Sequence, residues 1–326
     1  MASLAEIRAR LQAAESKNSG QSGGDNQIYP HWNMEEGANA VLRFLPDGNK
    51  QNTFFWVERA MIKLPFAGIK GEADSKQVSV QVPCVEMWNE ACPILAEVRG
   101  WFKDKSLEDM GRKYWKKRSY IMQGFVRENP LNDDKTPENP IRRFIIGPQI
   151  FQIIKSALMD PELEELPTDY ERGLDFRVTK TSKGGYADYS TSKWARKESA
   201  LTNEEKQIIE NLGLFTLADF LPKKPTEVEL KVIKEMFEAS VDGQSYDPER
   251  WGSYYRPAGV SAPASAVAAG NTTAAEKSAP AVSVVGDDFD DADVSNDAVE
   301  PLQTKPASSS NAQDILAMIR SRQQKT

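Results

Sequence analysis

Runs of alternating or β-rich residues occupy the middle of the chain. A period of two between apolar and polar positions indicates β-strands with one buried and one exposed face. Clusters of Gly, Pro, Asn or Asp bound most of these runs and predict turns between them. The predicted strands lie at residues 40–45, 54–62, 78–82, 119–126, 141–146 and 174–179.

Helix-start signals stand between the predicted strands. Pro93 and Pro148 each fit the first turn of a helix, where proline is tolerated. Residues 202–205 and 226–229 have the Thr-x-x-Glu spacing of a capping box, which satisfies free backbone N–H groups at a helix start. Many short strands with interspersed helices favour a small barrel or an open sheet over a doubly wound α/β fold. We therefore predict an α+β, mainly β, architecture.

Each end of the chain carries the same short amphipathic pattern, L-A-x-I-R-x-R-x-Q, at residues 4–12 and 316–324. A helix this short is marginal alone in water, so we expect it to order only on docking. Two similar arms favour self-association, with one arm able to compete with the other. Coincidence between two Arg/Ala-rich helices is the alternative. The residues that the first arm offers for self-association are Leu4, Ile7, Arg8, Arg10 and Leu11.

Composition divides the chain into three parts. Residues 1–26 hold the first arm and a Gly/Ser-rich linker, which is expected to be flexible. Residues 27–252 form the predicted core. Residues 253–326 are rich in Ala, Ser, Pro, Gly and Asp and are expected to be a disordered tail. This tail contains an acidic stretch at residues 287–300 and ends with the second arm.

Composition also bounds the class of protein. The chain has 326 residues, a formal net charge of −7 and a mean hydropathy of −0.56. It contains neither an apolar run that could span a bilayer nor an opening signal segment, which predicts a soluble protein of a cytoplasm-like compartment. Its two cysteines do not make a disulfide framework. A single histidine argues against histidine-based catalysis and against most zinc hydrolases.

Catalytic motifs are missing from the chain. It lacks a phosphate-binding P-loop and the motifs H-E-x-x-H, C-x-x-C and G-x-S-x-G. Asp133 with Asp134, and Glu229 with Lys231, faintly resemble the carboxylates of a metal nuclease. Solvated charge explains both pairs better. We therefore expect a protein without enzymatic activity, and a metal nuclease is the remote alternative.

Cations and aromatic residues interleave between residues 112 and 127. Single-stranded nucleic acid is bound by such surfaces, because cations follow the phosphates while flat rings stack on the bases. The alternative is an exposed charged loop beside ordinary core aromatics. The candidate DNA-binding residues in this stretch are Arg112, Lys113, Tyr114, Trp115, Lys116, Lys117, Arg118 and Tyr120.

A second stretch of the same kind lies between residues 177 and 194. Gly184 and Gly185 predict a tight hairpin between two short strands. Arg142 and Arg143 offer further phosphate contacts. The candidate DNA contacts in this second stretch are Lys180, Lys183, Tyr186, Tyr189 and Trp194.

Several segments, in the right order, resemble the helix-destabilising single-stranded DNA-binding proteins of T-even-like bacteriophages. Residues 43–46 read R-F-L-P, as in the first core strand of that family. Residues 116–120 read K-K-R-S-Y and resemble the basic stretch of its DNA cleft. Residues 176–189 resemble its Gly-containing hairpin, and the acidic tail is similar as well. The resemblance covers most of residues 1–300.

The resemblance implies an OB-fold-like barrel core with peripheral helices. It implies a protein of the host bacterial cytoplasm that coats single-stranded DNA cooperatively during phage DNA replication, recombination and repair. The implied partners are single-stranded DNA, further copies of the protein, and phage DNA polymerase, helicase loader and recombination proteins recruited through the acidic tail. No membrane is implied.

The family also carries a zinc site made of one His and three Cys. Here Cys84 and Cys92 remain, in a degenerate subdomain at about residues 60–100. Leu95 replaces a further cysteine, and no histidine lies near Arg59. A tetrahedral zinc site needs four ligands. We therefore expect no cofactor, and apolar packing around Leu95 in place of zinc.

Two hypotheses from different classes remain. The first is a non-enzymatic protein that binds single-stranded DNA cooperatively. Its first arm docks on a neighbouring protomer, and its acidic tail covers the basic surface when DNA is absent. The second is a virion or assembly scaffold that oligomerises through its terminal arms and whose basic patch meets acidic protein surfaces.

Overall fold

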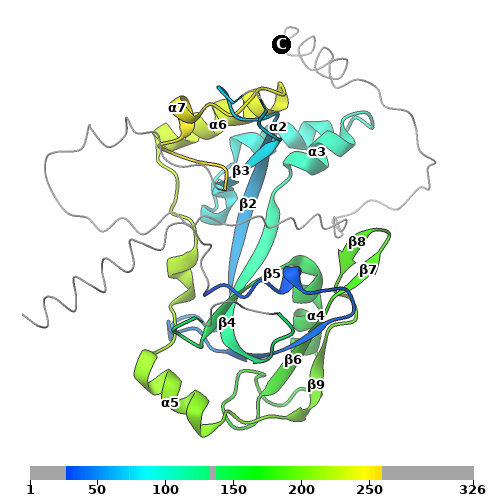
Figure 1. Ribbon diagram of the computed structural model, residues 1–326, viewed down its shortest axis with the longest axis vertical. Coiled ribbons are helices and arrows are strands. Elements are labelled where there is room, and N and C mark those ends of the chain that lie inside the picture. The colour runs from blue at the N-terminus through cyan, green and yellow to red at the C-terminus, as the bar shows by residue number, and fades with distance from the viewer. Residues whose placement is uncertain (1–26, 73, 132–136, 259–326) are drawn as a thin grey trace, which may run out of the picture.

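The computed structural model describes residues 27–72, 74–131 and 137–258 (Figure 1). Its main sheet follows the order β3-β2-β4-β1-β6-β9, and β5 pairs with β4 beside this path. The strand pairs of this sheet are antiparallel. Its strands are β1 (Asn39–Leu45), β2 (Val57–Phe66), β3 (Val78–Pro83), β4 (Lys117–Glu128), β5 (Arg142–Ile146), β6 (Leu174–Thr179) and β9 (Lys193–Glu198).

β4 is the central strand of the sheet. β1 pairs with its residues 123–128 and β2 with its residues 117–121, so β1 and β2 lie end to end along one edge. β5 pairs with residues 120–124 along the other edge. The connection between β1 and β2, residues 46–56, therefore leaves the sheet beside the middle of β4.

Two groups of helices cover the two ends of β2 and β4 (Figure 1). The middle of these two strands lies between the two groups. The upper core lies between β2, β3 and the helices α2, α3, α6 and α7, and the lower core between β1, β4, β5, β6 and α4. A smaller third cluster packs beneath α5. The helices are η1 (His31–Asn33), η2 (Val85–Trp88), α2 (Pro93–Trp101), α3 (Glu108–Tyr114), α4 (Pro148–Leu158), α5 (Asn203–Leu212), η3 (Leu217–Phe220), α6 (Glu227–Val241) and α7 (Pro248–Trp251).

The local predictions from the sequence are confirmed. Each predicted strand is present, and Pro93 and Pro148 open α2 and α4. Complete capping boxes start α5 and α6. β7 (Thr181–Lys183) and β8 (Tyr186–Asp188) form the predicted hairpin. Its turn residues Gly184 and Gly185 have φ values of 63° and 86°, which glycine adopts without steric cost.

Two expectations about the sheet need correction. β2 begins at Val57 and not at residue 54, because the Asn52 side chain bonds the Phe54 N–H and the Trp56 carbonyl and holds the preceding residues in a loop. The barrel is not confirmed. β3 and β9 are the edges of the described sheet and do not pair with each other, so the sheet is open. Within the described residues, no helix is long and apolar enough to cross a membrane.

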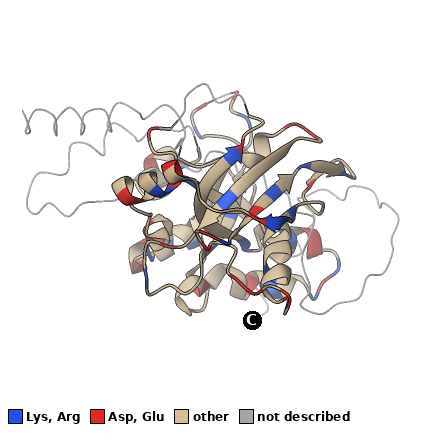
Figure 2. Ribbon diagram, turned by 90° about the horizontal axis from the view of Figure 1, so that it is seen from below, with Lys and Arg blue, Asp and Glu red and all other residues tan. Residues whose placement is uncertain are grey.

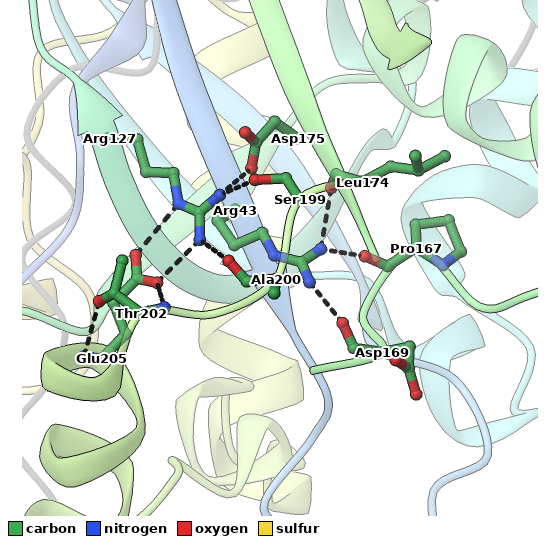
Figure 3. A network of polar contacts seen from close by, with 10 residues as sticks. All are labelled: Arg43, Arg127, Pro167, Asp169, Leu174, Asp175, Ser199, Ala200, Thr202 and Glu205. Carbon is green, nitrogen blue, oxygen red and sulfur yellow. Dashed lines mark hydrogen bonds and ion pairs between the residues drawn. The ribbon is translucent and has the colours of Figure 1, made fainter. Parts of the chain in front are cut away.

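Arg43 fixes the long connection before β6 (Figure 3). Its buried guanidinium donates hydrogen bonds to the carbonyl oxygens of Pro167, Asp169 and Leu174. The chain approaches so closely that a Cβ atom on Gly173 would lie 2.2 Å from the guanidinium nitrogens. A buried charge is costly unless polar partners satisfy it, so Arg43 and this connection depend on each other.

Arg127, near the end of β4, ties α5 to the same region (Figure 3). Its guanidinium bonds both carboxylate oxygens of Glu205, at 3.1 and 2.8 Å, and one of Asp175 at 2.8 Å. Glu205 is also the third helical residue in the capping box that begins at Thr202. Burial works to lower the pKa of Arg127, but these carboxylates outweigh it and raise the pKa.

Replacing Arg43 should test its structural role. Arg43→Met removes three buried hydrogen bonds from a charged donor to the carbonyl groups of Pro167, Asp169 and Leu174, so we expect the free energy of unfolding to fall by about 3 to 5 kcal/mol. Arg177→Met is the matched control on the neighbouring strand, because Arg177 is exposed, and it should change stability by less than about 0.5 kcal/mol. Urea unfolding measures both. Equal effects of the two variants would contradict the role of Arg43.

His31 is buried beside the base of the hairpin. Its ring lies 5.3 Å from that of Trp32 and 5.6 Å from that of Tyr189, between centroids. Lys180 donates to the carbonyl oxygens of Trp32 and Met34 at 2.6 and 2.8 Å. Burial lowers the pKa of His31 to about 4; a backbone hydrogen bond with Tyr29 opposes this effect, and the charge of Lys180 adds to it.

The low pKa of His31 predicts a loss of stability in acid. Between the ordinary pKa of 6.5 and about 4, the unfolded chain binds a proton that the native protein does not. The free energy of unfolding should therefore fall as the pH is lowered through this window, by about 2 to 3 kcal/mol from pH ~7.5 to pH ~4.5. In His31→Phe, this fall in the free energy of unfolding should be absent, as measured by urea unfolding at each pH. An identical pH dependence in both proteins would refute the assignment.

Candidate nucleic-acid interface

One face of the sheet stays open where the two cores meet. Glu58 pairs across the strands with Tyr120, and Ala60 with Arg118. Ala60 belongs to the upper core and Tyr120 to the lower core. Between them, the side chains of Glu58 and Arg118 are 50 % and 52 % exposed and form an ion pair of 3.4 Å. We call this ion pair and its surroundings the central surface.

A row of aromatic rings borders the central surface on the side of the lower core. Phe54 lies 4.7 Å from Trp56, and Trp56 lies 5.2 Å from Phe151, between ring centroids. Phe151 stacks on Tyr120 with centroids 3.4 Å apart and planes inclined by 10°. Exposure decreases along the row, from 57 % for Phe54 to 8 % for Tyr120. We call these four residues the aromatic row.

Two local structures hold the aromatic row in place. Asp47 accepts hydrogen bonds from the Asn52 side chain and from the Leu217 N–H, which fixes the loop that carries Phe54 and Trp56. α4 buries Ile150 and Ile154 in the lower core, which leaves Phe151 half-buried beside Tyr120. Lys155, one turn after Phe151 on the same side of the helix, is exposed. The stacked pair of Tyr120 and Phe151 is thus accompanied by one cation on each element, Arg118 on β4 and Lys155 on α4.

The β7–β8 hairpin is anchored to the same helix. Gln149 donates to an Asp188 carboxylate oxygen at 2.5 Å and accepts from the Tyr189 N–H at 2.7 Å. Lys183 and Tyr186 are cross-strand partners near the tip, and both are exposed. Figure 1 shows the hairpin projecting beside α4. The hairpin therefore carries an exposed cation and an exposed ring, and its base is fixed to the helix that carries Phe151.

A second aromatic pair borders the central surface on the side of the upper core. Trp115 packs edge-on against Phe102, with centroids 5.2 Å apart, and the Arg99 guanidinium lies 6.0 Å from the Trp115 ring. Glu86 of η2 accepts hydrogen bonds from Lys116, at 2.5 Å, and from Arg99. Burial works to raise the pKa of Glu86, but these two bonds outweigh it and lower the pKa.

Electrostatics connects the ion pair of the central surface to the aromatic row. Burial, and then the negative charge of Glu58, raise the pKa of Tyr120, while Arg118 works in the opposite direction. In Figure 2, Lys and Arg lie on several strands, whereas many Asp and Glu lie on the surrounding helices and loops. Several strands therefore carry cations, although the net charge of the chain is negative.

Several candidate residues from the sequence lie at or near this surface. Arg118 lies at its centre, Lys116 and Trp115 border it, and Lys183 and Tyr186 lie on the hairpin. Arg112 and Lys113 are exposed on α3, where Arg112 pairs with Glu108. Lys117 is half-buried, and alternation along β4 turns it to the opposite face from Arg118.

Other candidate residues are used inside the protein. Tyr114 packs against Trp101 and Phe237 in the upper core. Tyr189 is buried against His31, and Lys180 holds two backbone carbonyls. Arg142 and Arg143 are buried; Arg142 lies over the Tyr29 ring and Arg143 over the Phe220 ring, 3.8 Å from its centroid. Trp194 is half-buried against Phe44 and Phe176. Contacts within the protein thus account for these residues, and Tyr114 is a core aromatic, as in the alternative given for residues 112–127.

Sequence reasoning missed three of the four residues in the aromatic row. Phe54, Phe55 and Trp56 are consecutive, and a signal was present in that run, because neighbouring side chains in an extended segment point to opposite sides and cannot all be buried on one face. Phe55 is indeed buried, whereas Phe54 is exposed. Phe151 gave no signal, since its position in an amphipathic helix is typical of a core residue.

The degenerate zinc segment does not fit a zinc ion. Cys84 and Cys92 are buried in the upper core together with Leu95, which confirms the expected apolar packing. Arg59, near which the histidine of the phage family would fall, lies on the face of β2 opposite to the upper core. Its guanidinium donates to the Ser119 hydroxyl at 3.0 Å. A hydrogen bond between the two sulfur atoms raises the pKa of Cys84 and lowers that of Cys92 to about 6. In the part of the chain that the structure describes, no three His, Cys, Asp or Glu side chains gather.

Comparison with known proteins adds no identification. No protein-family model matches the chain, and no curated protein is significantly similar to it. The resemblance of short segments to the phage family therefore stays an expectation. The self-association residues of the first arm, and the whole second arm, lie outside the described residues.

Chelation should not affect the folded protein. Two thiols supply half of the ligands that a structural zinc site requires, so EDTA or about one equivalent of Zn²⁺ should shift the melting temperature by less than ~1 °C. Differential scanning calorimetry measures the shift, and elemental analysis after dialysis measures retained zinc. Stoichiometric zinc, together with a lower melting temperature after chelation, would contradict this prediction.

Proposed function

We propose that this protein binds single-stranded DNA across the central surface, with bases on the aromatic row and phosphates on the flanking cations. The observation that carries the proposal is the aromatic row itself. Rings of decreasing exposure from Phe54 to Tyr120, with centroids 3.4 to 5.2 Å apart, lie beside Arg118 and Lys155. Flat rings accept bases of any sequence, because every base has a π-face.

The fold supports a single strand as the ligand. Bases reach an aromatic ring only where they are unpaired or splayed out of a stack. Lys116 and Tyr120 are four residues apart on the extended chain, or about 13 Å at the rise of a β-strand, and this even spacing turns them to the same face, so one strand can contact both borders of the central surface. The cations of this surface supply the sequence-independent part of the affinity.

The wider role follows the resemblance. We propose that the protein coats single-stranded DNA cooperatively during phage replication, recombination and repair, and that it has no enzymatic activity. Its first arm is proposed to dock on a neighbouring protomer, and its acidic tail to recruit replication proteins. The choice of DNA over RNA rests on the resemblance alone, so an oligo-rU arm belongs in the test below.

Binding should depend on the aromatic row and on salt. Titration with oligo-dT should quench the tryptophan fluorescence of the wild-type protein, with log affinity falling by about 0.7 per phosphate neutralised as log salt rises. Phe151→Ala should weaken binding by about 5- to 150-fold, because one stacked ring is lost. The measurement is the dissociation constant at several salt concentrations.

The control is Tyr254→Ala, which removes a ring that is 42 % exposed just after α7. It should leave the dissociation constant unchanged. Circular dichroism establishes that each variant is folded. Wild-type affinity in folded Phe151→Ala would show that the aromatic row does not stack on bases, and no quenching of the wild-type protein at low salt would remove the proposal.

A further inference from the structure

Glu58 places a carboxylate in the middle of a surface that is proposed to bind a polyanion. Its side chain is 50 % exposed, and its Oε1 atom lies 3.4 Å from Nε of Arg118. An exposed ion pair of this kind contributes little to stability. Folding therefore gives no strong reason for an acid at this position, and its effect on the ligand becomes the question.

Phosphates and bases respond to this carboxylate in opposite ways. A phosphate that approaches Glu58 is repelled, and the repulsion grows as water is displaced from the contact. An unpaired base exposes an N–H group on its pairing edge, and this group can donate a hydrogen bond to a carboxylate. In a duplex those N–H groups are already engaged, and the outer surface is formed by two phosphate backbones.

The position of Glu58 makes this distinction possible. It faces Tyr120 across the strands, so a base that stacks along the aromatic row extends its edge toward the carboxylate. Lys155 on α4 and Lys116 at the border lie to either side, where phosphates can be accommodated. Arg118 offsets the charge of Glu58 enough for a strand to approach.

We propose that Glu58 is a specificity-determining residue that selects unpaired over paired nucleic acid by keeping phosphates away from the centre of the surface and accepting hydrogen bonds from base edges. This inference rests on the proposed function. It assigns the rejection of duplex to one side chain and not to the aromatic row alone.

The test compares single-stranded and duplex binding by Glu58→Gln, which keeps the shape of the side chain and removes its charge. A fluorescently labelled mixed-sequence strand and the same sequence as a hairpin duplex are titrated with the full-length protein at low and moderate salt. Duplex affinity should rise by about tenfold, and single-strand affinity should change by less than about threefold. The ratio of the two affinities should therefore fall by about tenfold.

Glu238→Gln is the matched control. Glu238 is 61 % exposed and pairs with Lys234 at 3.8 Å on α6, so the substitution makes the same change in net charge away from the central surface. Its ratio of affinities should equal that of the wild-type protein. An equal fall in both variants would reduce the effect to net charge and overturn the inference.

Failure of the inference and failure of the proposed function are distinguishable. If the wild-type protein binds the single strand and Glu58→Gln keeps the wild-type ratio, the inference is wrong and the proposed function stands. If the wild-type protein binds neither nucleic acid at low salt, the proposed function is wrong and the inference falls with it.

Discussion

The continuity of β4 is the constraint on which the rest of the structure depends. It pairs with β1 and β2 end to end along one edge. β4 contributes Tyr120 and Met122 to the lower core, while β2, which pairs with its first half, contributes to the upper core. Helices cover each core but not the strand between them. The loop that joins β1 to β2 must leave the sheet at this point, and it carries Phe54 and Trp56. The open surface and its aromatic rings thus have one topological origin.

The charges at the central surface are arranged in pairs that a ligand can rearrange. Arg118 is held by Glu58, while Lys116 and Arg99 share Glu86. The proposed polyanion ligand must displace these carboxylates from the cations, which costs part of its affinity. Arg43 and Arg127 have a different role, because their carbonyl and carboxylate partners join separate segments of the fold. A cation in this sequence therefore has one of two roles, and its partners in space determine which.

The same distinction explains what could be predicted from the sequence. Strand alternation, the capping boxes and the Gly184-Gly185 turn are local signals, and they were sufficient for β1 to β8 and for α2, α4, α5 and α6, but α3, α7 and β9 were not predicted. Tyr114 and Tyr120 stand in one basic stretch, yet Tyr114 enters the upper core through contacts with Phe237, more than a hundred residues away. Nothing near Tyr114 in the sequence marks that partner. The contact between Phe151 and Tyr120 is likewise set by the packing of α4 against β4. Alternation along one strand cannot predict such a contact.

The upper core shows how the fold keeps its shape without four metal ligands. Leu95 packs in this core with Cys84 and Cys92, while α6 contributes Ile233, Met236 and Phe237 to the same core. Apolar burial therefore joins the end of β3 to the start of α2. η2 lies between the two cysteines and carries Glu86, so the position of that carboxylate at the border of the central surface depends on apolar packing beneath it.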